Sequence, residues 1–130
     1  MELGLTGKHA LITGGSHGIG LATARALAQE GCHVAICGRT EKRLEEAREA
    51  LTEFSVEVLA LPADVLHEDQ IAAVMAAVVE NWGGLQILVN NVGGGGRWGH
   101  ESAVETEDKV WREVYDKNAM AAGRFTRLGL

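Results

Sequence analysis

The chain has 130 residues, enough for one domain with its own core, and its 46% hydrophobic and 23% charged residues are typical of a soluble protein. A net charge of −6 without any basic run argues against a nucleic-acid-binding surface. No apolar run approaches membrane-spanning length, and residues 1–4 do not begin a signal peptide, so we expect a cytoplasmic protein with no nucleic-acid and no membrane partner.

Four short runs rich in Val, Ile and Leu predict β-strands, at residues 10–13, 33–37, 57–61 and 86–90. The runs are nearly continuous in apolar character, as expected of strands that are covered on both faces. Helical stripes lie between them, one formed by Leu44, Ala47, Leu51 and Phe54 and another by Ile71, Val74, Met75, Val78 and Trp82. Strands and helices that alternate at this spacing predict an α/β fold with a doubly wound parallel sheet and right-handed crossovers.

Residues 10–21, with the sequence ALITGGSHGIGL, predict a buried strand that runs into a glycine turn and then a helix. Gly14, Gly18 and Gly20 allow a sharp turn, a close approach to a ligand and tight packing against the helix. The helix begins near Gly18, and its unpaired N–H groups and positive dipole end point at the turn. The pattern also fits an ordinary strand-to-helix turn, but the apolar strand before it and the good helix formers after it favour binding of a nucleotide phosphate.

The last predicted helix begins near Thr106, whose hydroxyl can cap it, and runs nearly to Leu130. Its apolar stripe consists of Val110, Trp111, Val114, Ala121, Ala122 and Phe125. Asn118 interrupts this stripe, and a polar side chain on that face needs a partner, of which a neighbouring carbonyl is the simplest. No strand follows the helix, so the fourth strand would keep an exposed apolar edge, and we expect the sequence to be unfinished.

Cysteine and histidine residues show no pattern of a metal site. Cys32 and Cys37 are expected to be reduced packing residues. The histidines are scattered, with no Cys or acidic partner at zinc spacing; they are His9, His17, His33, His67 and His100. The spacing therefore predicts no bound metal.

Four signatures occur in the order and spacing of one known family. They are Thr13-Gly14-x-x-x-Gly18-x-Gly20, Asp64-Val65 after the third strand, Asn90-Asn91-Val92-Gly93 after the fourth, and Asn118 in the next helix. In these signatures, and over essentially its whole length, the chain resembles the short-chain dehydrogenases/reductases, which transfer a hydride with a nicotinamide dinucleotide. The resemblance implies a Rossmann-like fold in which residues 1–130 are the N-terminal NAD(P)-binding part of a larger single-domain enzyme.

The resemblance assigns the glycine turn to one part of the cofactor. The backbone of residues 14–20, which follows Thr13 at the start of the motif, would hold the pyrophosphate. Ser16 and His17 would lie near the adenosine ribose, and Ile19 at the glycine turn.

The resemblance implies that the residues after the third and fourth predicted strands bind the rest of the cofactor. Asp64 and Val65 would flank the adenine ring. Asn91 and Gly93 would pass along the cofactor's ribose, and Asn90 would tie neighbouring strands together.

Arg39 follows the second strand, where dinucleotide folds choose between cofactors. A carboxylate there accepts bonds from a free ribose 2′-hydroxyl, whereas an Arg can pair with a 2′-phosphate. The sequence Cys37-Gly38-Arg39-Thr40 offers no carboxylate, although Glu41 just beyond it could instead pair with Arg39. The charge favours NADP(H) over NAD(H), with NAD(H) left open.

The same resemblance makes Asn118 an auxiliary catalytic residue that holds a water molecule in a proton relay. The family's catalytic Ser, Tyr and Lys would all lie after position 130 and are absent from this chain. Tyr115 and Lys117 are spaced too closely for the family's Tyr-x-x-x-Lys motif, point about 200° apart on a helix, and are expected at the surface.

The resulting prediction is an NADP(H)-dependent oxidoreductase that interconverts a carbonyl and an alcohol on a small-molecule substrate, as a homo-oligomer when full length. Residues 93–100 would lie beside the active-site mouth, either as a surface loop or as a substrate contact. The alternative is a non-catalytic dinucleotide-binding or interaction module that is complete at 130 residues. A methyltransferase on a similar fold is disfavoured by the Asn-Asn-Val-Gly sequence and by Asn118.

Overall fold

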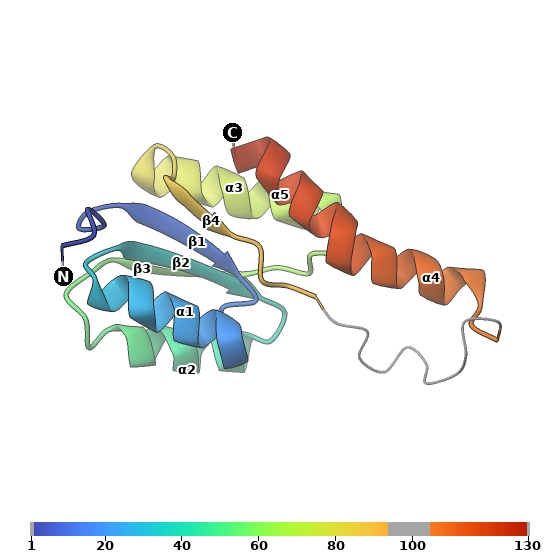
Figure 1. Ribbon diagram of the computed structural model, residues 1–130, viewed down its shortest axis with the longest axis horizontal. Coiled ribbons are helices and arrows are strands. Elements are labelled where there is room, and N and C mark those ends of the chain that lie inside the picture. The colour runs from blue at the N-terminus through green and yellow to red at the C-terminus, as the bar shows by residue number, and fades with distance from the viewer. Residues whose placement is uncertain (1, 94–104, 130) are drawn as a thin grey trace.

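The computed structural model describes residues 2–93 and 105–129, which form a four-stranded parallel sheet with helices on both faces (Figure 1). The strands are β1 (His9–Thr13), β2 (His33–Gly38), β3 (Val58–Pro62) and β4 (Ile87–Val89). Every strand end lies within one residue of its predicted position. The predicted doubly wound parallel sheet is therefore confirmed.

The strand order is β3-β2-β1-β4. The chain adds β2 and β3 on one side of β1, and then crosses back to place β4 on the other side of β1. Ligands of open α/β sheets bind where this reversal leaves a crevice, at the carboxyl ends of the strands. Here that point lies between β1 and β4, and β4 is an edge strand among the described residues.

The two central strands are buried on both faces because their side chains alternate between two cores. Leu11 of β1 packs in one cluster, together with Ile71 and Phe125. Its neighbours Ala10 and Ile12 pack in the cluster on the opposite face. Full burial of an aliphatic side chain of this size contributes about 1.5–3 kcal/mol, so the continuous apolar runs stabilise the sheet from both sides.

Two helices cover each face of the sheet (Figure 1). α1 (Gly18–Gln29) and α2 (Glu41–Leu51) lie on one face, and α3 (Glu68–Trp82) and α5 (Ala121–Gly129) lie on the other. The predicted stripes of α2 and α3 are buried, except that Phe54 lies beyond the end of α2 and Trp82 is only partly buried. No helix in the described part of the chain combines the length and the apolar character that crossing a bilayer requires.

The last helical segment differs from its prediction in two ways. It starts as α4 (Asp108–Tyr115), and its N-cap residue is Glu107 instead of Thr106, because Glu107 has the extended backbone that precedes the first turn. It then passes through a π-helical turn, η1 (Asp116–Met120), before α5. Only the α5 end of the apolar stripe is buried, at Ala121 and Phe125, whereas α4 has no buried residue and projects beyond the sheet (Figure 1).

Candidate functional site

A cleft of about 400 Å³ lies at the carboxyl ends of the strands. It is lined by the glycine turn and by the residues that follow β2, β3 and β4, with one further residue from η1. These residues are Gly14, Ser16, His17, Gly18, Ile19, Gly38, Arg39, Thr40, Arg43, Ala63, Asp64, Val65, Leu66, Asn91, Val92, Gly93 and Lys117. All of the cofactor-binding residues expected from the sequence are in this set except Thr13 and Gly20.

The glycine turn leaves the amino end of α1 open toward the cleft. Gly14 and Gly18 have φ values of +65° and +56°, which residues with a side chain rarely adopt. A Cβ atom at Gly18 would meet nothing within 4 Å, so the turn faces empty space there. The N-cap residue His17 makes no capping hydrogen bond with its side chain, and the first turn has no acidic residue. The positive end of α1 is thus available to an anion.

Thr13 and Gly20 support the turn from behind. A Cβ atom at Gly20 would collide with the carbonyl oxygen of Gly14, so only glycine lets α1 pack this closely against the turn. The hydroxyl of Thr13 accepts the N–H of Asn91 at 3.0 Å and lies 1% exposed. The structure places both as positioning residues and not as cleft-lining ones.

The end of β2 contributes two guanidinium groups. Arg39 lines the cleft, and so does Arg43 in the first turn of α2. Arg39 and Glu41, both in the described part of the chain, form no ion pair, so the alternative of a local Arg39–Glu41 pair is not seen. Arg43 was not expected from the sequence; it reaches the cleft because the first turn of α2 begins directly after the end of β2.

The end of β3 holds Asp64, the one carboxylate among the described lining residues. Its backbone N–H donates to Oε1 of Gln70 at 2.6 Å, and its Oδ1 accepts the N–H of Leu66 at 3.0 Å. Its Oδ2 also lies 3.7 Å from Nε2 of His67. These contacts fix the loop that carries Asp64 and Val65.

The end of β4 is tied to the glycine turn. The carboxamide of Asn91 donates from Nδ2 to the carbonyl of Gly14 at 3.2 Å. Asn90 was expected to tie neighbouring strands, which stays a prediction; its Nδ2 donates to the hydroxyl of Thr126 in α5 at 3.2 Å. The hydroxyl of Thr13 joins the strands at this position, because it bonds to Val89 as well as to Asn91.

Asn118 lies beside the same loop but does not line the cleft. Its Nδ2 donates to the carbonyl of Val114 at 2.9 Å, which is the local partner expected of a structural asparagine. A Cβ atom at Gly93 would lie 2.8 Å from Oδ1 of Asn118, so glycine is what lets the two segments meet. The proposed role of Asn118 in a proton relay stays a prediction.

Lys117 departs from its expected surface position. It is half-buried and lines the cleft, whereas Tyr115 is 60% exposed as expected. Residues two apart on a helix point in nearly opposite directions, so an outward Tyr115 turns Lys117 inward. The expected loop at residues 93–100 lies outside the described residues apart from Gly93.

The comparisons identify a family. A family model described as short chain dehydrogenase matches residues 8–130. A putative ketoacyl reductase of Streptomyces coelicolor is 39% identical over 118 residues, which cover 91% of this chain and 44% of that protein. The structure of L-sorbose reductase from Gluconobacter frateurii, complexed with NADPH and L-sorbose, is 41% identical with a TM-score of 0.93 and covers 100% of this chain and 48% of that one.

A structure of NAD⁺-bound xylitol dehydrogenase is also similar, with 29% identity, a TM-score of 0.88 and coverage of 96% of this chain and 47% of that one. The chain therefore spans about half the length of the relatives that it matches. The strand order, the glycine turn and the match over residues 8–130 agree with one another. The chain belongs to the short-chain dehydrogenase family.

Proposed function

We propose that this domain binds NADP(H) and forms the cofactor-binding part of an oxidoreductase that interconverts a carbonyl and an alcohol. The observation that carries the cofactor choice is the pair of guanidinium groups, Arg39 and Arg43, at the end of the cleft beside β2. A carboxylate that could accept bonds from a free 2′-hydroxyl is missing from the described lining residues at this end. Two positive groups and the Thr40 hydroxyl suit a 2′-phosphate.

The residues present fit a dinucleotide. The open space at Gly18 and the uncapped amino end of α1 suit the pyrophosphate. Asp64 and Val65 line the cleft after β3, where they would flank the adenine ring, and Asn91 and Gly93 would follow the second ribose. When bound, the nicotinamide supplies the hydride acceptor or donor. The chain's own contribution is to hold it in a fixed position, and Asn118 would hold a water molecule near that end.

The relatives support the binding of a nicotinamide dinucleotide. The L-sorbose reductase structure contains NADPH, whereas the xylitol dehydrogenase structure contains NAD⁺. The fold thus accommodates both cofactors, and the charge beside β2 is what favours NADP(H) here. The family resemblance would place the catalytic Ser, Tyr and Lys, and with them the substrate, in the part of the relatives' length that this chain does not span.

The test is a titration of the whole protein with NADPH and with NADH. The wild type is expected to bind NADPH more tightly, and Arg39→Asp to lose that preference. Loss of one charged contact costs about 1.5–3 kcal/mol, which is roughly a tenfold change in affinity or more. Arg43→Gln should weaken NADPH binding and leave NADH binding unchanged.

Lys42→Gln is the matched control, because Lys42 is an exposed cation of α2 that does not line the cleft. It should bind both cofactors like the wild type. A wild type that prefers NADH would contradict the assignment of NADP(H). Consumption of NADPH by the whole protein with a panel of small ketones tests the reaction itself, and failure across aldehydes and ketones would count against it.

A further inference from the structure

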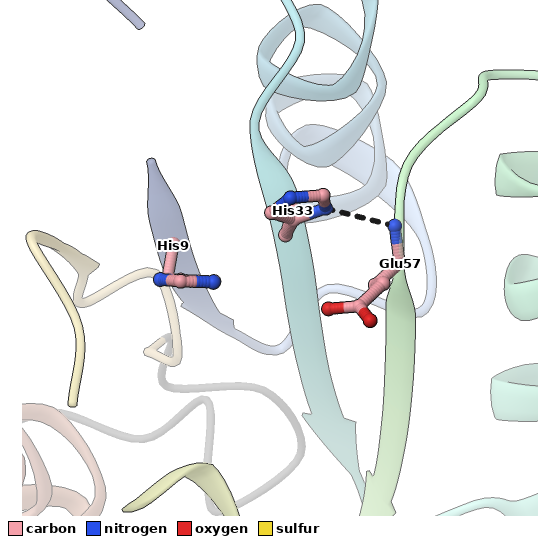
Figure 2. A group of neighbouring side chains, drawn as sticks. All are labelled: His9, His33 and Glu57. Atoms are coloured by element: carbon pink, nitrogen blue, oxygen red, sulfur yellow. Dashed lines mark hydrogen bonds between the residues drawn. The ribbon is translucent and has the colours of Figure 1, made fainter. Parts of the chain in front are cut away.

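Three polar side chains meet at the amino ends of neighbouring strands, far from the cleft. His9 and His33 are direct partners in the pairing of β1 with β2. The pairing of Val34 with Val58 places Glu57 next to His33, just before β3. Partners in adjacent parallel strands lie about 4.8 Å apart and point to the same face. Figure 2 shows the three side chains in this row, from β1, from β2 and from the residue just before β3.

The donor atoms of this His9–His33–Glu57 cluster are close enough to share one ion. One nitrogen of each imidazole and one carboxylate oxygen all lie within 4.8 Å of one another. Two imidazoles and a carboxylate form a donor set that Zn²⁺ and similar transition-metal dications prefer, whereas Mg²⁺ prefers oxygen ligands. We propose that the His9–His33–Glu57 cluster binds a Zn²⁺-like dication, with water completing the coordination.

One hydrogen bond fixes the tautomer of His33. Its Nδ1 accepts the backbone N–H of Glu57 at 3.0 Å, so Nδ1 is unprotonated and faces Glu57 (Figure 2). A metal ion can use this same lone pair without a change of tautomer, once the ring has turned away from the N–H of Glu57. The N–H of Glu57 then loses its acceptor, but Glu57 is exposed and water can replace that bond.

Trp82 of α3 positions two of the ligands. Its Nε1–H donates to Oε2 of Glu57 at 2.9 Å, which orients the carboxylate and leaves Oε1 free to ligate. Its ring also stacks on His9, with 4.7 Å between the centroids. Such hydrogen-bonded partners behind the ligands are typical of metal sites.

Closing the site requires only side-chain movement. Ligand atoms in a tetrahedral zinc site lie about 3.4 Å apart, so the donor atoms must approach one another by about 1 to 1.5 Å. Rotation of the exposed Glu57 and of the two half-buried rings supplies this movement. The cluster lies five residues before the glycine turn along β1, about 16 Å away, so the ion would clamp strand ends and would not enter the cleft.

The sequence did not predict the His9–His33–Glu57 cluster because its residues lie far apart along the chain. The two histidines and the carboxylate come from three separate strands, and 24 residues separate His33 from Glu57. Short-range zinc motifs place pairs of ligands a few residues apart, so the spacing of residues along the chain does not reveal this geometry.

The experiment is calorimetric titration of the whole protein with ZnCl₂, and separately with MgCl₂. The wild type should show saturable Zn²⁺ binding that Glu57→Gln weakens at least tenfold, with no comparable binding of Mg²⁺. Gln at position 57 keeps an oxygen for the Trp82 N–H and removes only the charge, so the fold should be preserved. The control Glu46→Gln changes an exposed carboxylate of α2 outside the cluster and should bind Zn²⁺ like the wild type.

Trp82→Phe keeps a ring for stacking and removes the hydrogen bond to Glu57, so it should weaken Zn²⁺ binding about tenfold. In the wild type, Zn²⁺ should also shift the imidazole NMR signals of His9 and His33 and not that of His67, a readout that depends on no variant. Absence of saturable Zn²⁺ binding would overturn the proposal. So would Zn²⁺ binding that Glu57→Gln does not change, because the ion would then occupy another site.

Discussion

The hydroxyl of Thr13 accepts the backbone N–H of Asn91 at 3.0 Å, and so joins the end of β1 to the loop after β4. The same oxygen accepts the N–H of Val92 at 3.2 Å, and the hydroxyl donates to the carbonyl of Val89 at 3.3 Å. One buried side chain therefore fixes the backbone at the point where the strand order reverses. Two of the residues that it holds, Asn91 and Val92, line the cleft.

Thr13→Val should lower the free energy of unfolding by about 1–3 kcal/mol, because two N–H groups lose their acceptor while the size of the side chain is kept. It should also weaken cofactor binding, because the Asn91 loop is released. Thr13→Ser keeps the hydroxyl and should lose only about 1 kcal/mol, for the missing methyl group. Urea unfolding and NADPH titration of the whole protein measure both effects. Equal losses for the two variants would show that the hydroxyl has no such role.

Two glycines of the turn should respond differently to alanine. Gly18→Ala places a methyl group in the open cleft, so the protein should fold with a loss of about 1–2 kcal/mol for the positive φ and bind the cofactor at least tenfold more weakly. Gly20→Ala drives a methyl group into the Gly14 carbonyl, so it should lose more stability than Gly18→Ala.

Gly123→Ala is the control for these two variants, because a Cβ atom there meets nothing within 4 Å and the residue lies within α5. It should stabilise the helix by about 0.5–1 kcal/mol and leave cofactor affinity unchanged. Unfolding curves and titrations separate the three cases. Normal cofactor affinity in a folded Gly18→Ala protein would contradict the placement of the pyrophosphate.

The sequence predicted the sheet well because its signals are local. The apolar runs of β1 and β2 and the stripe of α3 each depend on residues that are neighbours in the chain. The glycine turn is local as well, so its boundaries at Thr13 and Gly18 were predictable.

What the sequence did not predict depends on contacts between distant segments. Lys117 reaches the cleft because α5 packs against α3 in one particular rotation, and the sequence did not predict the π-helical turn that contains Lys117. His33 and Glu57 become neighbours only through strand register. The N-cap residue of α4 is Glu107, one residue after the predicted Thr106, and helix propensity does not locate a helix end to within one residue.

The stability of the protein should fall in alkaline solution because of Cys37. Burial raises the pKa of the Cys37 thiol from 9.0 to about 11, and the backbone N–H of Gly14 offsets this only in part. The thiol of the unfolded chain ionises near pH 9, while the thiol of the folded protein stays protonated. The protonated thiol therefore contributes fully to the free energy of unfolding below pH 9, and this contribution is lost as the pH rises toward 11. The free energy of unfolding should fall by about 1.4 kcal/mol per pH unit in this range, or by about 2–3 kcal/mol in all.

Cys37→Ala should flatten this alkaline decline, whatever its stability at pH 7, because the unfolded variant has no thiol to ionise at this position. Cys32→Ala removes the other buried thiol and should retain more of the decline. Urea unfolding of the whole protein at pH 8, 9, 10 and 11 gives the slopes. A Cys37→Ala slope identical to that of the wild type would refute the assignment.

The polypeptide of residues 1–130, prepared alone, should self-associate through α4. This helix has no buried residue, and Trp111 and Tyr115 are 54% and 60% exposed, four residues apart on one helical face. Contiguous exposed apolar surface of this kind promotes association, and β4 adds an unpaired strand edge in the described residues.

Light scattering and calorimetry on this polypeptide test the prediction. The wild-type polypeptide should form dimers or larger species, and the double variant Trp111→Ser/Tyr115→Ser should shift it toward monomer. Val79→Ser is the control, because Val79 is an apolar residue of α3 that is 54% exposed and lies outside α4. If the wild-type polypeptide is a monodisperse monomer with one cooperative unfolding transition, α4 is not an association surface. Association that Val79→Ser reduces as much as the double variant would show that apolar exposure in general, and not α4, drives it.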